Sequence, residues 1–190
     1  MKKILFLLFL AGLQGCTSSL YYFEIPANEI SPVVRQKKAL LINISNVSDT
    51  LIVTGNNAKK LTVINYRKSL KQLLFTTFSL TFDSIYFKEE KYYPDFRKTV
   101  LQEGTTLLVT NISAGWYYNG EVHNYKDRNK QTGCKVGIKG EIFIDGKPKT
   151  SFEGEGASTL SAPAKRDFEK VFIDSQKQLS RLIYKYVVNK

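Results

Sequence analysis

One histidine and two cysteines are the side chains of this sequence on which a nucleophilic triad or a Cys-His pair could be built, and their small number limits that chemistry. His123 is the only histidine, so a nucleophilic triad or a Cys-His pair would have to be built on it. It lies in a very polar segment, where a solvent-exposed side chain is expected. The two cysteines are Cys16 and Cys134. One histidine and one free thiol cannot complete a structural zinc site of the usual Cys/His type.

Other chemical patterns are also absent from the sequence. The seventeen carboxylates never occur in the spacing of a calcium-binding loop. The stretch FEGEGAS at 152–158 contains Gly154 and Gly156 but has neither a P-loop lysine nor a complete dinucleotide fingerprint, so we expect these glycines to mark a bulge or a strand end. Cys134 is expected to be a small buried hydrophobe. The sequence therefore predicts no enzyme, no cofactor and no metal site.

The first half of the chain predicts a strand, a loop and an amphipathic helix. KALLINIS at 38–45 is typical of a buried strand. A loop should follow at 46–61, with a short strand at 51–54. Apolar residues at helical spacing then predict a helix over about 63–82, with a strand near 83–87.

The second half of the chain predicts three strands and a helix. The strands are expected at 105–118, where the first half alternates apolar and polar residues, at 134–144, which also alternates, and at 149–157, which follows the turn Asp145-Gly146. Asp145-Gly146 is a strong hairpin signal, and we expect Lys147 and Pro148 to lengthen that loop. The polar segment 119–133 should connect the first two strands as a long hairpin arm.

The last helix should begin near Ser161, Ala162 and Pro163, since serine is a good cap and proline is tolerated in a first turn. Its apolar stripe, interrupted by Ser175, comprises Phe168, Val171, Phe172, Leu179, Leu182, Ile183 and Tyr186. A basic stripe lies opposite, and a solvated helix face explains it adequately.

These elements predict the fold class α+β: a two-layer sandwich in which two helices cover one face of a mainly antiparallel sheet, in the order strand, helix, three strands, helix. We expect a signal peptide at 1–15, a lipidated N-terminus and tether at 16–37, and a single domain at 38–190.

The end of the strand at 105–118 carries three neighbouring aromatic residues, Trp116, Tyr117 and Tyr118. Two interpretations are open: alternate rings could lie in the core, or the group could contact a protein partner or a glycolipid together with the basic residues of the arm. Those basic candidates for a contact site are Lys126, Arg128 and Lys130.

The first segment is typical of an export signal. Lys2 and Lys3 precede a short apolar run that ends near Gln14, which is too short to span a bilayer. The tetrapeptide Leu13-Gln14-Gly15-Cys16 resembles the lipobox of bacterial lipoproteins, in which the cysteine receives acyl chains, palmitate among them, and becomes the new N-terminus. Two or more chains hold a domain at a membrane durably. The alternative is a soluble secreted protein cleaved near Gly15.

The composition is that of a folded, basic protein. The chain has 190 residues, 43% of them hydrophobic, and a formal net charge of +11. This charge suits a surface held near anionic lipid or glycolipid, although lysines that simply provide solubility would give the same value. Nucleic acid is not an expected partner of an exported chain.

The predicted architecture resembles small outer-membrane lipoproteins of Gram-negative bacteria, and specifically the YajG-like family. The similar stretches are TLLVTNISAGWYYNG, TSFEGEGAS and RDFEKVFIDSQKQLSRLI. The chain resembles LptE-like proteins more weakly, because TSSLYY stands where they have a Gly-Phe-His stretch. It also resembles ABC transport auxiliary lipoproteins weakly, since Tyr21 and Tyr22 match their Tyr-Tyr pair.

The resemblance implies an envelope lipoprotein anchored to the outer membrane by lipid on Cys16. We expect this lipoprotein to be non-catalytic and to bind an envelope protein partner through an exposed sheet edge and the loop 119–133. The alternative is an accessory component of lipid or lipopolysaccharide transport that contacts anionic glycolipid.

Overall fold

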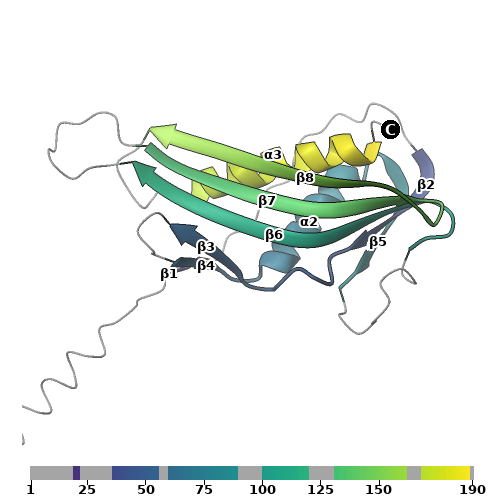
Figure 1. The fold of residues 1–190 in the computed structure, drawn as a ribbon, viewed down its shortest axis with the longest axis horizontal. Helices are drawn as coiled ribbons and strands as arrows, with labels where there is room; N and C mark the ends of the chain where they lie inside the picture. The colour runs from purple at the N-terminus through teal and green to yellow at the C-terminus, as the bar shows by residue number, and fades with distance from the viewer. Residues whose placement is uncertain are drawn as a thin grey trace, which may run out of the picture.

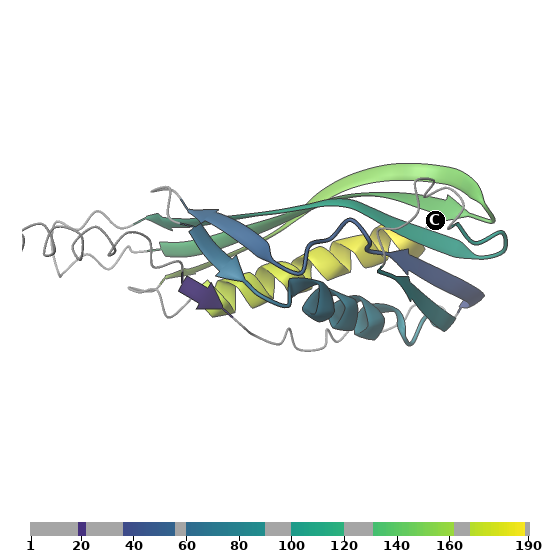
Figure 2. The ribbon, with the colours of Figure 1, turned by 90° about the horizontal axis from the view of Figure 1, so that it is seen from below.

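The structure, a computed structural model, describes residues 19–21, 36–55, 60–89, 100–119, 131–161 and 168–188. Eight strands form one mixed sheet, and helices α2 and α3 lie together on one of its faces (Figure 1, Figure 2). The predicted two-layer α+β sandwich is therefore confirmed. The elements in chain order are β1 (Ser19–Tyr21), β2 (Gln36–Asn43), β3 (Leu51–Gly55), β4 (Lys60–Val63), α2 (Tyr66–Phe78), β5 (Phe82–Lys88), β6 (Thr105–Asn119), β7 (Gln131–Ile144), β8 (Lys147–Ser161) and α3 (Phe168–Val188).

Strand β6 is the centre of the sheet. On one side it pairs with β7, which pairs in turn with β8, and this meander is antiparallel. On its other side, two strands pair with β6 in parallel. Strand β2 pairs with the first part of β6, and β3 pairs with its last part. Strand β5 adds to β2 in parallel, while β4 and then β1 add to β3. The sheet is thus divided along one side of β6 into two groups of strands (Figure 1).

Two predicted boundaries in the first half are wrong. The loop predicted at 46–61 contains the start of β4, which pairs with β3 as a hairpin. The predicted helix over 63–82 is shorter, because Val63 belongs to β4 and Phe82 begins β5. Asn65 precedes α2 in a left-handed conformation with φ 54°, which asparagine tolerates better than most residues.

The β7–β8 connection is tighter than predicted. Asp145 and Gly146 have φ values of 49° and 77°, as a two-residue hairpin turn requires. Lys147 and Pro148 do not lengthen the loop but begin β8, where they pair with Ile144 and Phe143. Proline is tolerated there because β8 is an edge strand. The backbone N–H of Gly104 donates to Asp145 Oδ1 at 2.8 Å, and Asp145 N donates back to Gly104 O at 2.8 Å.

Helix α3 packs directly against β8, and two glycines make this possible. A Cβ atom on Gly156 would lie 2.0 Å from the carbonyl oxygen of Ser175, and one on Gly154 would lie 2.1 Å from Leu182 Cδ2. The sequence-based prediction that these glycines mark a bulge or a strand end is wrong: both lie inside β8 and give the helix room. Ser161, predicted to start the helix, is the last residue of β8, and 162–167 lie outside the described residues.

The core fills the space between the sheet and the two helices. Its fully buried side chains come from both helices and from strands that include β2, β6 and β7; among them are Ile42 of β2, Leu74 and Phe78 of α2, and Phe172 of α3. Neither described helix is long and apolar enough to span a membrane.

Candidate functional site

Trp116 and Tyr117, near the end of β6, point to opposite faces of the sheet. Trp116 faces the helices, where its ring meets Phe168 edge-on with centroids 6.1 Å apart, and it packs against the core. Tyr117 lies on the outer face over Gly133, and its hydroxyl is 2.7 Å from Thr159 Oγ1. These contacts give Trp116 and Tyr117 structural roles in holding β6, β7, β8 and α3 together.

Of the other predicted site residues, the structure describes only part of Tyr118. For Tyr118 it describes the backbone, which pairs with Thr132. The remaining members of the predicted site lie outside the described residues, as does His123: they are Cys16, Lys126, Arg128 and Lys130. Their contact roles stay predictions.

Trp116 is the only tryptophan in the chain, so its fluorescence reports directly on this packing. We expect a blue-shifted emission in the native protein and a red shift on unfolding in urea, because the ring lies against Phe168 in the native state. Adding phospholipid vesicles should not change the emission. A shift on vesicle addition in the folded protein would instead place Trp116 at the membrane interface.

Cys134 is buried on the inner face of β7 beneath α3, which confirms its predicted role as a small buried hydrophobe. The hydroxyl of Ser175 lies 2.8 Å from Cys134 O and 2.6 Å from Val171 O, so it can donate to either carbonyl. Burial raises the pKa of the Cys134 thiol to about 12. Such a thiol is protonated at neutral pH and is a poor nucleophile.

A polar cluster that sequence reasoning missed surrounds Cys134. The hydroxyl of Tyr66 donates to Gln176 Oε1 at 3.3 Å, and burial raises the pKa of Tyr66 above its ordinary range. Among the described residues, three buried polar atoms have no hydrogen-bond partner: Trp116 Nε1, Thr132 Oγ1 and Gln176 Nε2. Only the interruption of the apolar stripe at Ser175 signalled polar groups here.

The buried thiol predicts a loss of stability in alkali. An unfolded cysteine releases its proton near pH 8.5, whereas native Cys134 keeps it up to about pH 12. The contribution of Cys134 to stability should therefore be constant below about pH 8.5 and fall as the pH rises above it, by roughly 2 kcal/mol at pH 10. Urea unfolding at pH 7.5 and pH 10 measures the difference, which should shrink in Cys134→Ala. An equal pH dependence in both proteins would contradict this assignment.

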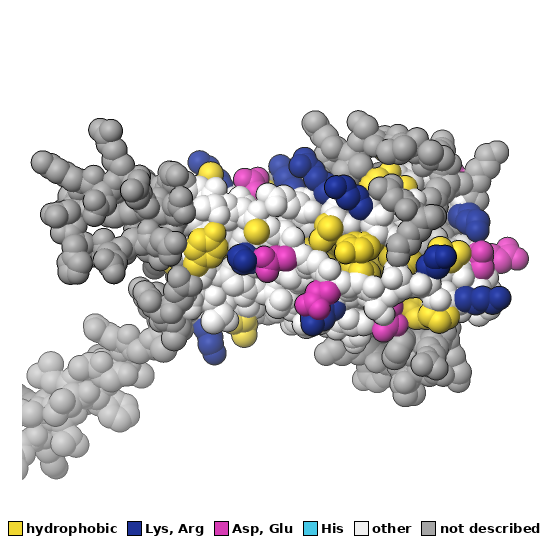
Figure 3. Space-filling view, turned by 45° about the horizontal axis from the view of Figure 1, so that its top comes forward, with side chains coloured by type: hydrophobic (Ala, Val, Ile, Leu, Met, Phe, Trp, Pro, Cys, Tyr) yellow, Lys and Arg dark blue, Asp and Glu magenta, His cyan; other side chains and the backbone are white. Residues whose placement is uncertain are grey.

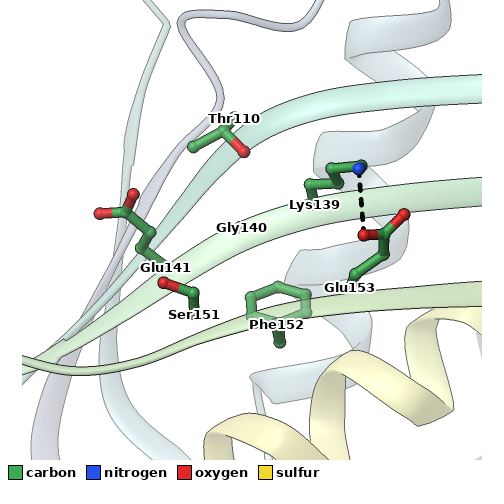
Figure 4. Close-up of a pocket in the computed structure, with 7 residues that line it drawn as sticks. All are labelled: Thr110, Lys139, Gly140, Glu141, Ser151, Phe152 and Glu153. Atoms are coloured by element: carbon green, nitrogen blue, oxygen red, sulfur yellow. Dashed lines mark ion pairs between the residues drawn. The ribbon is translucent and has the colours of Figure 1, made fainter.

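The outer face of the meander holds a hollow of about 390 Å³ where β6 is bulged at Thr110. Figure 4 shows Lys139 and Glu153 pointing toward each other on one side of it, while Glu141 and Ser151 line another side. The ion pair between Lys139 and Glu153 measures 3.0 Å. A second exposed pair, Lys135 and Glu155, is separated by 3.1 Å. Exposed pairs of this kind contribute little to stability.

A second hollow, of about 430 Å³, lies where the sheet is divided. Within the described residues, no backbone hydrogen bond joins loop 44–50 to 109–113 of β6. The loop is held toward α2 instead: Arg67 Nε donates to Val47 O at 2.7 Å, and Tyr66 N donates to Asp49 O at 2.8 Å. The lining combines neutral polar and apolar side chains: Asn46, Val47, Ser48, Thr50, Leu51, Ile52, Tyr66, Asn111 and Ile112.

Comparisons with known proteins show the class of fold. No protein-family model and no curated protein sequence matches this chain. A DUF330-family protein from Xanthomonas campestris superposes with a TM-score of 0.52 at 10% identity, over 90% of this chain and 95% of that one. This likeness shows a shared fold.

Two further solved structures are similar at lower scores. Rare lipoprotein B from Shewanella oneidensis has a TM-score of 0.48 at 10% identity, over 80% of this chain and 94% of that one. A putative neuraminyllactose-binding hemagglutinin homolog from Helicobacter pylori has a TM-score of 0.49 at 9% identity, over 88% and 92%. The similar structures thus include bacterial lipoproteins.

Proposed function

We propose that this chain is a non-catalytic lipoprotein of the bacterial outer membrane, anchored by lipid on Cys16, and that it binds an envelope protein along the free edge of β8. The observation that carries the binding proposal is the length of that edge. Strand β8 has 15 residues, and among the described residues it pairs with β7 alone.

An edge strand offers a ladder of unpaired N–H and C=O groups to another chain. Helix α3 covers the inner side of β8, so an added strand would continue the sheet without exposing the core. Basic and acidic side chains are interspersed over the neighbouring outer face, with apolar ones scattered among them (Figure 3). Main-chain hydrogen bonds would supply affinity, and alternate side chains would supply specificity.

A pair of proline variants tests the edge. Successive amides of a strand point to opposite sides, so one of Ala157→Pro and Ser158→Pro removes a hydrogen bond to β7 and the other blocks only the free edge. Thermal unfolding identifies the variant that keeps native stability. A photoreactive residue placed at Thr159 should crosslink the otherwise wild-type protein to its partner. In the proline variant that keeps native stability, this crosslink should be lost.

The matched control places the same photoreactive residue at Gln72, on the exposed face of α2. We expect it to give no such product. An unchanged crosslink in the stable proline variant would contradict binding at the β8 edge.

The anchor has a separate test. The mass of the mature protein should exceed that of the chain from Cys16 onward by the mass of its acyl chains, and Cys16→Ser should abolish the addition. An unmodified cysteine at the mature N-terminus would refute the anchor.

A further inference from the structure

We propose that the end of the body formed by Ser19, Gly55, Lys60 and Asn119, here called the anchor end, is held at the bilayer surface while the Asp145–Gly146 turn points away from it. This inference rests on the proposed lipid at Cys16 and adds an orientation to it. Its basis is the position of β1 in the sheet.

The position of Ser19 follows from the directions of four strands. Strand β6 runs toward the anchor end, and β3 runs parallel to it, ending at Gly55. Strand β4 is antiparallel to β3, and β1 is parallel to β4. The chain therefore enters β1 at the anchor end, where Ser19 pairs with Leu61 beside the exposed Lys60 (Figure 1, Figure 2).

The distance from lipid to body is limited by chain length. Cys16 and Ser19 are three residues apart in the sequence, and an extended chain covers at most about 3.6 Å per residue, so Ser19 lies within about 11 Å of the lipidated residue. Without the β1–β4 pairing, the first anchored residue would be Gln36 and the reach would rise to about 70 Å. Part of the segment 16–37, predicted as a tether, thus belongs to the sheet.

The opposite end of the meander lies far from the anchor. Strand β8 spans 15 residues from the Asp145–Gly146 turn to Ser161, about 50 Å at the usual rise per residue. A body of this length held by its end projects the free edge of β8 outward from the membrane. This orientation leaves the edge open to a partner along its whole length.

Two exposed lysines at opposite ends provide a matched measurement. Lys60→Cys marks the anchor end and Lys149→Cys lies near the distal turn; both can be labelled with a fluorescent maleimide because Cys134 is buried and Cys16 carries lipid. The lipidated full-length protein is reconstituted in vesicles of phosphatidylethanolamine and phosphatidylglycerol that contain a headgroup-attached quencher. We expect quenching at position 60 to exceed that at position 149 at least several-fold. Equal quenching at the two positions would overturn the orientation.

A variant with a longer linker between the lipid and β1 provides the second part of the experiment. Ten Gly/Ser residues inserted between Thr17 and Ser18 leave β1 intact and should reduce quenching at position 60 toward the value at position 149. Unchanged quenching would show that something other than the short linker holds the body, and would overturn the inference. Flotation with the vesicles is measured in parallel: a wild-type protein that does not float refutes the lipid anchor itself, whereas one that floats with equal quenching refutes only the orientation.

Discussion

Gly156→Ala should be among the most destabilising single substitutions in this protein. The added Cβ would lie 2.0 Å from Ser175 O and 2.6 Å from Leu179 N, and both are backbone atoms of α3. A side chain could rotate away, but the helix backbone cannot move without separating from β7 and β8. We expect a loss of at least about 3 kcal/mol, which lowers the melting temperature by about 6–12 °C.

Gly115→Ala is the matched control, because the nearest atom to its added Cβ is Thr54 O at 3.9 Å, an ordinary contact. Its melting temperature should stay within about 2 °C of wild type. Circular dichroism melting of the two variants separates close packing from a general requirement for glycine in strands. Equal effects at the two positions would contradict the close approach of α3.

Phe172→Ala should lower the stability of the protein by a similar amount. The cause is opposite, because this substitution leaves a cavity instead of adding an atom. Phe172 is fully buried and contacts Tyr66 and Phe168, with ring centroids 6.3 Å and 5.6 Å away. Through these rings it links α2 to the end of α3 that holds Trp116. Truncating a buried phenylalanine costs about 3–5 kcal/mol.

Phe75→Ala is the control for that substitution, because Phe75 is 49% exposed on α2. Its effect on urea unfolding should be under about 1 kcal/mol. The Phe172 variant should also show a red-shifted Trp116 emission before unfolding, since Phe168 loses its support. A Phe172 variant as stable as the Phe75 variant would contradict the assignment of this cluster to the core.

Strong periodicity made the longest elements of the fold predictable from sequence. The apolar stripe of α3 and the alternation in β7 each extend over more than ten residues, so chance patterns cannot imitate them. Strand β4 has four residues and was missed, because a strand this short has too few positions to show alternation. The parallel additions of β2 and β3 to β6 depend on tertiary packing that no local pattern encodes.

The candidate site was less predictable than the fold. The sequence identified Trp116 and Tyr117 as notable, but only the β6–β7 register shows that Tyr117 lies opposite Gly133, and Trp116 opposite Cys134. The polar cluster of Tyr66, Ser175 and Gln176 joins residues more than 100 positions apart. Gly154 and Gly156 indicated a special backbone position in this segment. That they make room for α3 could not be predicted, because the contact between β8 and α3 forms only in the folded structure.

The reciprocal hydrogen bonds between Gly104 and Asp145 have a consequence for how the protein can be produced. They join the start of β6 to the β7–β8 turn, and Lys38 adds an ion pair to Asp145 at 3.3 Å. Many secreted proteins would cross-link such a junction with a disulfide, whereas this one uses groups that no reductant attacks. A version lacking the first sixteen residues should therefore fold in the reducing cytoplasm of an expression host as well as in an oxidising compartment.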